Sequence, residues 1–530
     1  MKILTLQLMG HDANVTYYDG TNVKYLNLER LTRVKKYAYN YHNLRHVREH
    51  ISSMNIDYDD LDIIAFTYLS VADDDWKFDE NEQVKEVTQE QFDYYHPHLM
   101  MRAKKYFRVR HHYCHKRTAD WLFGDAPKAL VIDGHGDYKE HISVFDKETK
   151  LKEHRMSDML SIGRLYSLSS LLLMEIPQNS EIDALGGTVD NVGKIMGLMS
   201  YGEYNKDYAD WLRQFKFEDV TYEMYNRLQF ERFQHLKKID IVKGCSNGVG
   251  MKPDYDTVDW LHTWQEVLFD YIIDFTKQYF DKDEVFSFSG GVAHNVCLNE
   301  RLSKEFPNMV IPPCVGDEGL SLGIMYEMMQ RYNILEDFPK GQFTQEKIED
   351  INSTTVDIII DRLALGKVVV NYQGLSEIGP RALGRRSIFF RTDLEVATKM
   401  FHDRHIKHRE WWRPYGIIIL EEELSNYLDT TVASPHMLHT AQVINKEALK
   451  GVVHVDNSVR YQTVNKDDGW LYDIVKGVHK RTGVPAIINT SLNQHGLPIM
   501  YSEAEFYNYM QQENCDVYAI GNEVYEHDND

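Results

Sequence analysis

The alternation of apolar and polar positions predicts two similar β-rich units in the first part of the chain. The first begins with an apolar strand over Ile3–Leu8, followed by a shorter strand and an Asp-Gly hairpin. The second begins with a buried strand over Ala129–Ile132 and continues with another strand at His141–Phe145. In both units the first strand runs into an acidic loop that contains glycine. We therefore interpret the two units as a duplication.

The acidic loops are Gly10-His11-Asp12 in the first unit and Asp133–Asp137 in the second. Two strand–loop–strand units of this kind resemble the duplicated halves of actin-like ATPase folds, which implies that the loops face each other across a cleft. Further on, a strand over Val285–Ser289 enters Gly290-Gly291, and a helix is predicted over Asn295–Phe306. Paired glycines at such a turn let backbone N–H groups approach a phosphate or a nucleoside.

A polar, aperiodic stretch over Leu335–Asn352 predicts a domain boundary. We place the first domain at residues 1–345 and the second at residues 346–530. Beyond the boundary, strands are predicted near Val368–Tyr372, Gly416–Leu420 and Ala486–Asn489. The pattern indicates an α/β fold for both parts.

Composition narrows the class of protein. The 530 residues include 59 Lys and Arg against 81 Asp and Glu, which gives a net charge of −22. With 43% hydrophobic and 26% charged residues, we expect a soluble globular protein. The negative charge disfavours indiscriminate binding to nucleic acid. The chain has no long apolar span and no signal-peptide cleavage site, and its five widely spaced cysteines suit a reducing compartment, so we expect a cytoplasmic protein without a membrane partner.

The charges are distributed unevenly along the chain. Val71–Asp93 holds nine acidic residues, and we interpret it as a solvated surface excursion without a chemical role. Met101–Arg117 carries seven Lys and Arg and no acid, which fits either a surface helix face or a patch that faces an anion. Gly379–Arg413 has a net charge of +5, and its Gly-Pro turn and arginines suit bidentate recognition of phosphate.

A possible metal site begins at His111 and His115, whose spacing of four places both imidazoles on one face if the segment is helical. The alternative is that the two histidines merely lie on a helix. A mixed site needs carboxylates from elsewhere, and Asp133 and Asp317 in strand-end loops are the candidates. Iron, zinc and manganese all fit such a ligand set.

Taken together and in order, these segments resemble the O-carbamoyltransferase family of nodulation and antibiotic-tailoring enzymes. The resemblance spans nearly the whole chain and rests on many ordered motifs, among them Gly10-His11-Asp12-Ala13, Glu29-Arg30, His111-His112…His115, Asp133-Gly134-x-Gly136-Asp137, Gly193-Lys194-Ile195-Met196-Gly197, Gly290-Gly291-Val292-Ala293…Asn295, Gly316-Asp317-x-Gly319, Gly379-Pro380-Arg381-Ala382-Leu383-Gly384 and Asn489-Thr490-Ser491…Asn493.

The resemblance implies two catalytic domains. The N-terminal one would have a duplicated actin-like (ASKHA) fold, like the tRNA threonylcarbamoyl transferases, and the C-terminal one a YrdC-like fold. In the family, the C-terminal domain makes carbamoyl adenylate from ATP and carbamoyl phosphate. The N-terminal domain then transfers the carbamoyl group to an acceptor hydroxyl. Magnesium is expected to accompany ATP.

The resemblance also assigns residues. The implied ligands of the metal, with iron(II) the implied ion, are His111, His115, Asp133 and Asp317. The implied contacts to ATP and carbamoyl phosphate are Arg381, Lys407, Arg413, Arg460, Asn489, Ser491 and Asn493. The implied contacts to adenosine are Gly290, Gly291 and Asn295. The implied catalytic residues are Lys194, which would neutralise phosphate, and His11 and Asp12, which would orient or deprotonate the acceptor.

Departures from the family pattern leave the acceptor open. Asn14 replaces the usual serine, and Glu318 stands beside Asp317 where a small residue is usual. Family acceptors include sugars, aminoglycosides, macrolactams and cephem precursors, and the basic run at Met101–Arg117 raises a hydroxymethylated nucleotide or DNA base as an alternative. An actin-like kinase or ATPase is the alternative enzyme class, and a nucleic-acid-binding regulator is the non-enzymatic one. A homodimer is also left open.

Overall fold

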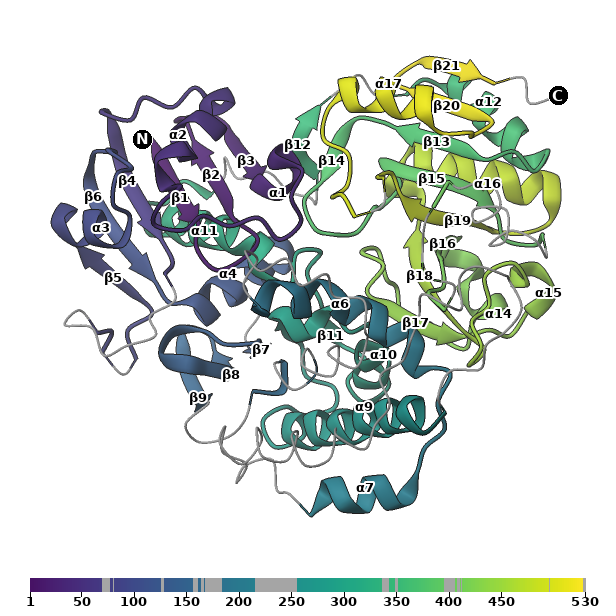
Figure 1. Ribbon diagram of the computed structural model, residues 1–530, viewed down its shortest axis with the longest axis horizontal. Helices are drawn as coiled ribbons and strands as arrows, with labels where there is room; N and C mark the ends of the chain where they lie inside the picture. Colours follow the sequence, from purple (N-terminus) through teal and green to yellow (C-terminus); the bar gives the residue numbers. More distant parts are fainter. Residues whose placement is uncertain are drawn as a thin grey trace. The chain divides into compact units, whose positions relative to one another are not determined.

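The computed structural model divides the chain into two compact units, Met1–Gly341 (unit 1) and Gln342–Asp530 (unit 2) (Figure 1). Each unit is built on β-sheets of its own. The residues that the structure describes are 1–68, 77–79, 81–124, 128–155, 161–163, 166, 184–214, 255–335, 343–347, 351–394, 406–407, 410, 412–494 and 496–527.

The first sheet of unit 1 has six strands in the order β3-β2-β1-β4-β6-β5. Strands β1, β2 and β3 are antiparallel neighbours, whereas β4 and β6 continue the sheet parallel to β1. The edge strand β5 is antiparallel to β6. The bounds are β1 Ile3–Gln7, β2 Asn14–Tyr18, β3 Val23–Asn27, β4 Leu61–Phe66, β5 Val84–Val87 and β6 Ala103–Val109.

The second sheet of unit 1 repeats this plan. Its order is β9-β8-β7-β10-β11, with β7, β8 and β9 antiparallel neighbours and β10 and β11 parallel to β7. Strand order and directions therefore match those of β3-β2-β1-β4-β6, which confirms the predicted duplicated fold. The bounds are β7 Lys128–Ile132, β8 Glu140–Asp146, β9 Thr149–Arg155, β10 Phe286–Ser289 and β11 Met309–Val310.

Two buried helices of unit 1 pack against each other and against these sheets. Helix α4 (His111–Phe123) follows β6, and α11 (Leu320–Arg331) packs on it and on β1. The other helices of the unit are α1 Leu28–Thr32, α2 Val47–His50, α3 Gln89–Tyr95, α6 Ala184–Met199, α7 Lys206–Arg213, α9 Tyr255–Thr276 and α10 Val296–Glu305. Within the described ranges, none of the helices combines the length and the apolar character that a membrane crossing requires.

Unit 2 is built on an eight-stranded mixed sheet in the order β17-β18-β16-β19-β15-β13-β20-β21, and β12 and β14 form a separate pair. These strands are β12 Phe343–Lys347, β13 Val369–Tyr372, β14 Leu375–Glu377, β15 Arg386–Arg391, β16 Gly416–Leu420, β17 His439–Gln442, β18 Ser458–Val464, β19 Ala486–Ser491, β20 Val517–Ile520 and β21 Glu523–Glu526. The helices are α12 Ser353–Ala364, α14 Leu424–Tyr427, α15 Lys446–Leu449, α16 Trp470–Thr482 and α17 Glu503–Gln512.

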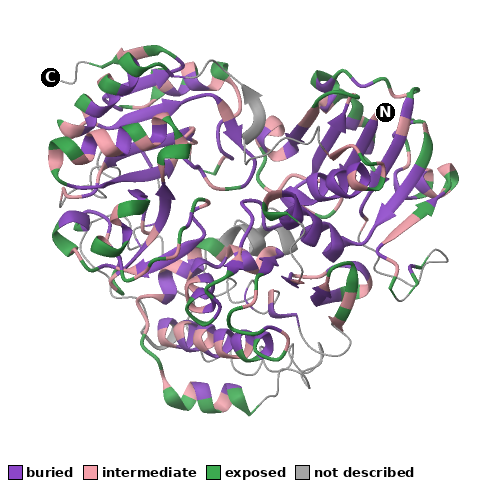
Figure 2. Cartoon of the chain, turned by 180° about the vertical axis from the view of Figure 1, so that it is seen from behind, coloured by how far each residue is buried: buried purple, intermediate pink, exposed green. Residues whose placement is uncertain are grey.

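The sheet of unit 2 lies between two apolar clusters, which confirms the α/β prediction for this part of the chain. On one face, α12 and α16 contribute Ile359 and Ile474 to a cluster that also contains Ile418 of β16. The alternate residues Ile417 and Ile488 belong to a second cluster on the other face. Because successive side chains of a strand point to opposite faces, both faces of this sheet are covered and its inner strands are buried (Figure 2).

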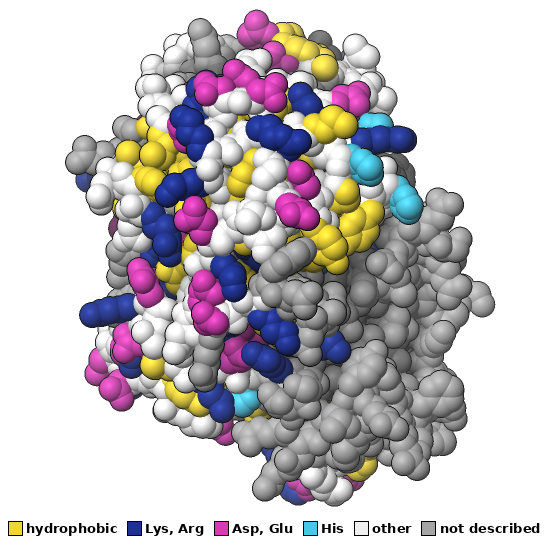
Figure 3. Space-filling view, turned by 90° about the vertical axis from the view of Figure 1, so that its left-hand side faces the viewer, with side chains coloured by type: hydrophobic (Ala, Val, Ile, Leu, Met, Phe, Trp, Pro, Cys, Tyr) yellow, Lys and Arg dark blue, Asp and Glu magenta, His cyan; other side chains and the backbone are white. Residues whose placement is uncertain are grey.

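The basic run Met101–Arg117 does not form one exposed basic face, because four of its seven Lys and Arg residues are buried, namely Arg108, Arg110, Lys116 and Arg117. Arg108 is fully buried and its Nη2 lies 3.1 Å from Asp137 Oδ1. Arg117 is also buried, with Nη1 2.8 Å from Asp120 Oδ2. Both acidic partners lie outside the run, so a count of the charges within Met101–Arg117 does not include them. On the side of the molecule in Figure 3, Lys and Arg are interspersed with Asp and Glu.

The acidic segment Val71–Asp93 is only partly a surface excursion. Residues 71–76 and 80, within it, lie outside the described residues. The later part forms the edge strand β5 and most of α3, whose Phe92 is fully buried. The prediction is therefore wrong for this part, since a segment rich in acidic side chains can still pair with a sheet edge.

A buried histidine makes the stability of unit 1 sensitive to acid. The His96 ring packs against Phe66 and Phe92, with centroid distances of 4.8 and 5.0 Å, and neither ring nitrogen has a hydrogen-bond partner among the described residues. Burial lowers the pKa of His96 to about 3. Because the unfolded chain binds a proton near pH 6.5, this group destabilises the fold progressively as the pH falls below that value.

We expect the substitution His96→Phe to remove this sensitivity. Between pH 7 and pH 5, His96 costs about 2 kcal/mol of the free energy of unfolding, whereas phenylalanine costs nothing over the same range. Denaturant titrations of both proteins at several pH values measure the difference. Stability curves that run parallel for the two proteins would show that His96 does not carry this acid sensitivity.

Candidate functional site

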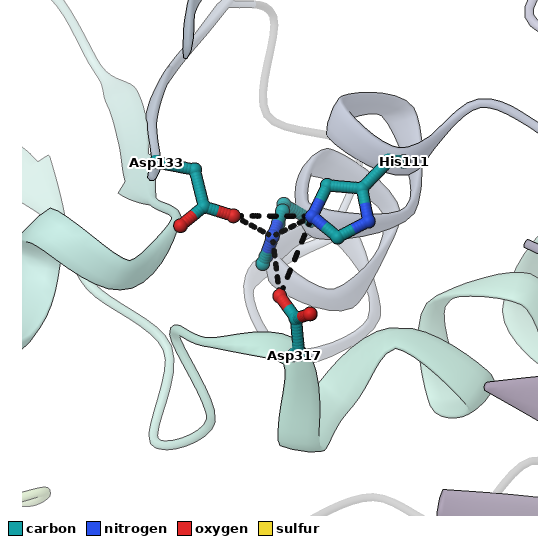
Figure 4. Close-up of side chains that lie close together, drawn as sticks. His111, Asp133 and Asp317 are labelled. Atoms are coloured by element: carbon teal, nitrogen blue, oxygen red, sulfur yellow. Dashed lines mark hydrogen bonds and ion pairs between the residues drawn. The ribbon is translucent and has the colours of Figure 1, made fainter. Parts of the chain in front are cut away.

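Two histidines and two aspartates converge in unit 1, as the sequence predicted. His111 and His115 lie one turn apart on α4, with their Nε2 atoms 3.2 Å apart. Asp133, which follows β7, places Oδ2 3.1 and 3.0 Å from these two atoms. Asp317, which precedes α11, places Oδ1 3.3 and 3.4 Å from them (Figure 4).

The spacing of these four atoms fits one metal ion. All four residues are buried, and the ligand atoms lie within 4.8 Å of one another. Atoms bound about 2.0–2.2 Å from a common tetrahedral centre are separated by about 3.3–3.6 Å, close to the 3.0–3.4 Å found for the pairs that include a histidine. Two imidazole nitrogens and two carboxylate oxygens form a mixed set that suits iron, zinc or manganese.

The electrostatics of the cluster suit a cation. Burial opposes charge on all four groups, yet Asp317 and Asp133 raise the pKa of His111 well above its ordinary value. His111 and His115 in turn hold the pKa of Asp133 well below the usual range, and His11 together with His111 does the same for Asp317. Since a divalent ion requires neutral imidazoles, metal binding would release protons and would weaken as the pH falls.

Neighbouring backbone groups hold the ligands in place. Asp133 Oδ1 accepts the N–H groups of Gly134 and Gly291 at 2.6 and 3.1 Å. Gly290 has φ +91°, and a Cβ there would meet the Ile132 carbonyl oxygen at 2.3 Å. The Gly290-Gly291 turn therefore supports the aspartate, which is a role that the sequence did not indicate for this pair.

We expect the substitution Gly291→Ala to weaken metal binding without unfolding the chain. A Cβ at Gly291 would lie 2.8 Å from Asp133 Oδ1, so the carboxylate must move. Changes just outside a ligand shell lower metal affinity about 10–100-fold. Competition with a chelator measures the affinity, and Gly134→Ala is the matched control because its Cβ would meet nothing within 4 Å. Equal affinities in the two variants would contradict the role assigned to Gly291.

The predicted catalytic pair lies beside the cluster. His11 Nδ1 is 2.8 Å from Asp12 Oδ2 and 3.7 Å from Asp317 Oδ2. Although burial opposes it, Asp317 and Asp12 raise the pKa of His11 to about 9. Lys36, which the sequence analysis missed, donates from Nζ to Asp12 Oδ2 at 2.8 Å. The sequence does not single out Lys36, because it stands in a stretch that contains several other basic residues.

Asn14 and Glu318 both contact the turn that carries Asp317. Asn14 Nδ2 donates to the Asp317 carbonyl oxygen at 2.8 Å, and its Oδ1 accepts from Ser321 N at 2.9 Å. The buried Glu318 carboxylate accepts the Gly316 N–H at 3.2 Å, and it lies 3.6 Å from His294 Nε2. The two departures from the family pattern therefore flank a predicted metal ligand.

Two other predicted residues, Asn295 and Lys194, are not among the residues of the metal cluster. The Asn295 side chain caps α10 by accepting the N–H groups of Cys297 and Leu298. Lys194 lies half-buried on α6 and is not among the contacts of the cluster described above. His111 gains a contact that the sequence did not indicate, because its backbone N–H donates to Asp137 Oδ2 at 2.7 Å.

In unit 2 the structure brings three predicted residues together. Lys407 Nζ donates to the Asn493 carbonyl oxygen at 3.0 Å, to Asn493 Oδ1 at 2.9 Å and to the Ser491 carbonyl oxygen. Ser491 Oγ donates to Asn493 Oδ1 at 2.5 Å. The lysine is thus held at the end of β19 by the Asn489–Asn493 segment, with its side chain almost fully buried.

The other predicted residues of unit 2 lie on neighbouring strands and loops. Arg460 of β18 and Asn489 of β19 are both in register with Gly416 of β16, which lies between them. Asn489 Nδ2 donates to the Ala382 carbonyl oxygen at 2.9 Å, in the loop that carries Arg381. Arg413 Nη1 is 2.9 Å from Glu410 Oε2.

Comparison with known proteins gives two family matches. The model described as Carbamoyltransferase N-terminus matches residues 2–325, and the model described as Carbamoyltransferase C-terminus matches residues 360–527. Together they cover most of the chain and both of its units.

Several curated proteins are similar to the chain over much of its length. An uncharacterized protein of Methanocaldococcus jannaschii is 29% identical, over 79% of this chain and 83% of that protein. The nodulation protein NolNO of Sinorhizobium fredii is 27% identical, over 75% and 60% of the two chains. The 3'-hydroxymethylcephem-O-carbamoyltransferase of Amycolatopsis lactamdurans is 25% identical, over 64% and 65%.

Proposed function

Because the chain belongs to the carbamoyltransferase family, we propose that it is an ATP-dependent O-carbamoyltransferase that works in two steps. In the first step unit 2 joins ATP and carbamoyl phosphate, with consumption of water, to form carbamoyl adenylate, pyrophosphate and phosphate. In the second step unit 1 transfers the carbamoyl group to an acceptor hydroxyl, which loses its proton, and AMP leaves.

The observation that supports this proposal most is that each unit contains a separate polar constellation. Unit 1 holds the cluster of His111, His115, Asp133 and Asp317, and unit 2 holds Lys407 against Ser491 and Asn493. A kinase or simple ATPase with an actin-like fold needs no second nucleotide-activating unit. The two-step reaction gives both constellations a use.

In unit 2, cations would bind the phosphates of both co-substrates. Lys407 is held in one position by the Asn493 amide oxygen and by backbone carbonyl groups, so its charge is preorganised. Arginine side chains can bind phosphate oxygens in pairs, and charge that develops on leaving oxygens is stabilised electrostatically. We assign this role to Lys407 with Arg381, Arg413 and Arg460, and hydrogen bonding around the triphosphate or the carbamoyl amide to Asn489, Ser491 and Asn493. Magnesium would accompany ATP.

In unit 1, His111, His115, Asp133 and Asp317 would hold a divalent metal ion, with iron(II) the ion that the family implies. A bound ion supplies Lewis-acid stabilisation to the phosphate of the adenylate. Gly290, Gly291 and Asn295 would lie against the adenosine, and Lys194 would neutralise phosphate. Their positions at the β10–α10 turn and on α6 are compatible with these assignments.

The acceptor proton would pass to His11. Asp12 Oδ2 engages Nδ1 of this ring, which leaves Nε2 for the hydroxyl proton of the acceptor. Lys36 keeps Asp12 ionised, since burial opposes but Lys36 and His11 lower the pKa of Asp12 to about 2. A divalent cation bound by Asp317 would offset one of the carboxylates that raise the pKa of His11, and would bring that pKa closer to neutrality.

We assign the acceptor to phosphate-free hydroxyl compounds such as sugars or small natural products. The nucleotide or DNA acceptor depended on a basic patch at Met101–Arg117, and most of its Lys and Arg residues are buried, among them Arg108 and Arg117, which form ion pairs. The names of similar proteins, which include nodulation proteins and hydroxymethylcephem O-carbamoyltransferases, also support small hydroxylated acceptors.

The experiment is a screen with labelled carbamoyl phosphate and ATP. Hydroxylated acceptors with and without phosphate groups are incubated with the protein, and the products are detected by mass. We expect carbamoylation of at least one phosphate-free hydroxyl compound, with AMP as the nucleotide product. ADP formation that is independent of carbamoyl phosphate would instead support a kinase or ATPase. Carbamoylation of nucleotides alone would contradict the proposed acceptor class.

A further inference from the structure

Four side chains around the turn Ala382–Arg386 in unit 2 carry a buried oxygen that has no hydrogen-bond donor among the described residues. They are the carboxylate of Glu377 and the amides of Asn371, Gln373 and Asn489. Each of these residues is at most 1% exposed. A buried polar atom left unpaired costs about 1–3 kcal/mol, so a group of them indicates a place where a ligand supplies donors.

Glu377 has a divided role in this group. Its Oε1 atom fixes the turn by accepting three backbone N–H groups at 2.8, 3.0 and 3.1 Å, those of Leu383, Arg385 and Arg386. Its Oε2 atom is buried and has no partner in the described part of the chain. A carboxylate accepts hydrogen bonds but donates none, so a partner for Oε2 must bring an N–H or O–H group.

The amide side chains hold the same turn. Asn371 Nδ2 donates to the Gly384 carbonyl oxygen at 2.8 Å, and Asn489 Nδ2 donates to the Ala382 carbonyl oxygen at 2.9 Å. Gln373 is joined to the turn through its backbone, since its N–H donates to the Arg385 carbonyl oxygen at 2.9 Å. Both ends of the Gln373 side-chain amide are buried without partners among the described residues, so it can donate as well as accept.

We propose that Glu377 Oε2 and the Gln373 amide bind the amino group of carbamoyl phosphate and so select this co-substrate over acyl phosphates that lack it. The inference rests on the proposed function. The phosphate and carbonyl oxygens of carbamoyl phosphate carry no hydrogen atom to donate, whereas its nitrogen carries two. That nitrogen is bonded to the carbon that carries the phosphate, so its acceptors must lie beside the cations that hold the phosphate.

The position of the turn agrees with this requirement. The turn follows Arg381 directly in sequence, and Arg381 is one of the proposed phosphate-binding cations. Asn489, a proposed ligand of the co-substrates, is bonded to the same turn. ATP has further donors in the adenine amino group and the ribose hydroxyl groups, and a rise in the KM for ATP in the test below would assign the acceptors to them.

The test is the steady-state rate of pyrophosphate release with Glu377→Gln. The glutamine keeps an oxygen for the three backbone N–H groups but turns the second acceptor into a donor. We expect the KM for carbamoyl phosphate to rise at least about tenfold, with the KM for ATP within about twofold of wild type. We also expect the preference for carbamoyl phosphate over acetyl phosphate, as a ratio of kcat/KM values, to fall by a similar factor.

Asp516→Asn is the matched control, because Asp516 is a buried acid that accepts the Val368 N–H at 2.7 Å at the opposite end of β13. Its variant should keep the wild-type preference. If Glu377→Gln does not fold, Gln373→Met replaces it, with the same rise in KM for carbamoyl phosphate expected. An unchanged KM and preference, or a rise in the KM for ATP alone, overturns the inference.

The outcomes separate this inference from the proposed function. If the wild-type chain releases no pyrophosphate from ATP and carbamoyl phosphate, both fail. If the wild-type chain is active and the variants at Glu377 and Gln373 bind carbamoyl phosphate as well as it does, only the inference about the amino group fails.

Discussion

Replacing His111 and His115 together by alanine is expected to abolish metal binding and carbamoyl transfer while leaving pyrophosphate release intact. The two Nε2 atoms supply half of the ligand atoms of the cluster, and the remaining carboxylates would lie close together without a compensating charge. Since even changes outside a ligand shell cost about 10–100-fold, the loss of two ligands should lower the transfer rate by about 100-fold or more.

Metal content per chain and the two partial reactions measure this outcome. His112→Gln is the matched control on the same helix, because His112 bonds Ser143 at 2.8 Å and does not belong to the cluster. Full metal occupancy in the double variant would show that the ligands are assigned wrongly. Loss of pyrophosphate release together with transfer would contradict the separation of the two steps between the units.

The substitution Lys407→Met should have the opposite pattern and stop the first step. It removes a buried ammonium that Ser491 and Asn493 hold in place, and methionine is of similar length without the charge. Loss of one preorganised electrostatic donor costs about 10²–10³ in rate. We therefore expect pyrophosphate release to fall by about that factor while the metal content of unit 1 is unchanged.

Lys476→Met provides the comparison for Lys407→Met. Lys476 lies on α16 of the same unit and forms an exposed ion pair with Glu422 at 2.9 Å, so its loss should leave the rate near wild type. Equal rates of pyrophosphate release in the two variants would show that Lys407 has no special role. A fall in thermal stability that accounts for the lost activity of Lys407→Met would point to a structural role only.

The duplication in unit 1 could be predicted from the sequence because it depends on local patterns. Apolar strands such as Ile3–Gln7 and Lys128–Ile132 each run into an acidic loop, and the two sheets then repeat one strand order. The metal cluster was also predictable in outline, since His111 and His115 have helical spacing. Asp133 and Asp317 could be named as candidates because both stand in strand-end loops, but whether they reach the histidines depends on tertiary contacts that the sequence does not show.

The errors of sequence interpretation concern charges whose partners are distant in sequence. Arg108 and Arg117 belong to a run without acids, yet they pair with Asp137 and Glu327 once the chain is folded. For the same reason Lys36 gave no signal, although it forms an ion pair with Asp12. A count of charges reports the composition of a segment, whereas its exposure is decided by the packing of other segments against it.

The central claim is that one chain divides the reaction between a nucleotide-activating unit and a metal-dependent transfer unit. The most direct measurement is carbamoyl-phosphate-dependent release of pyrophosphate from ATP by three proteins in parallel: wild type, Lys407→Met, and the double alanine variant of His111 and His115. We predict release by wild type and by the histidine variant, with AMP as the final nucleotide product of wild type when an acceptor is present, and almost none by Lys407→Met. Pyrophosphate release that Lys407→Met retains, or that the histidine variant loses, would contradict the account.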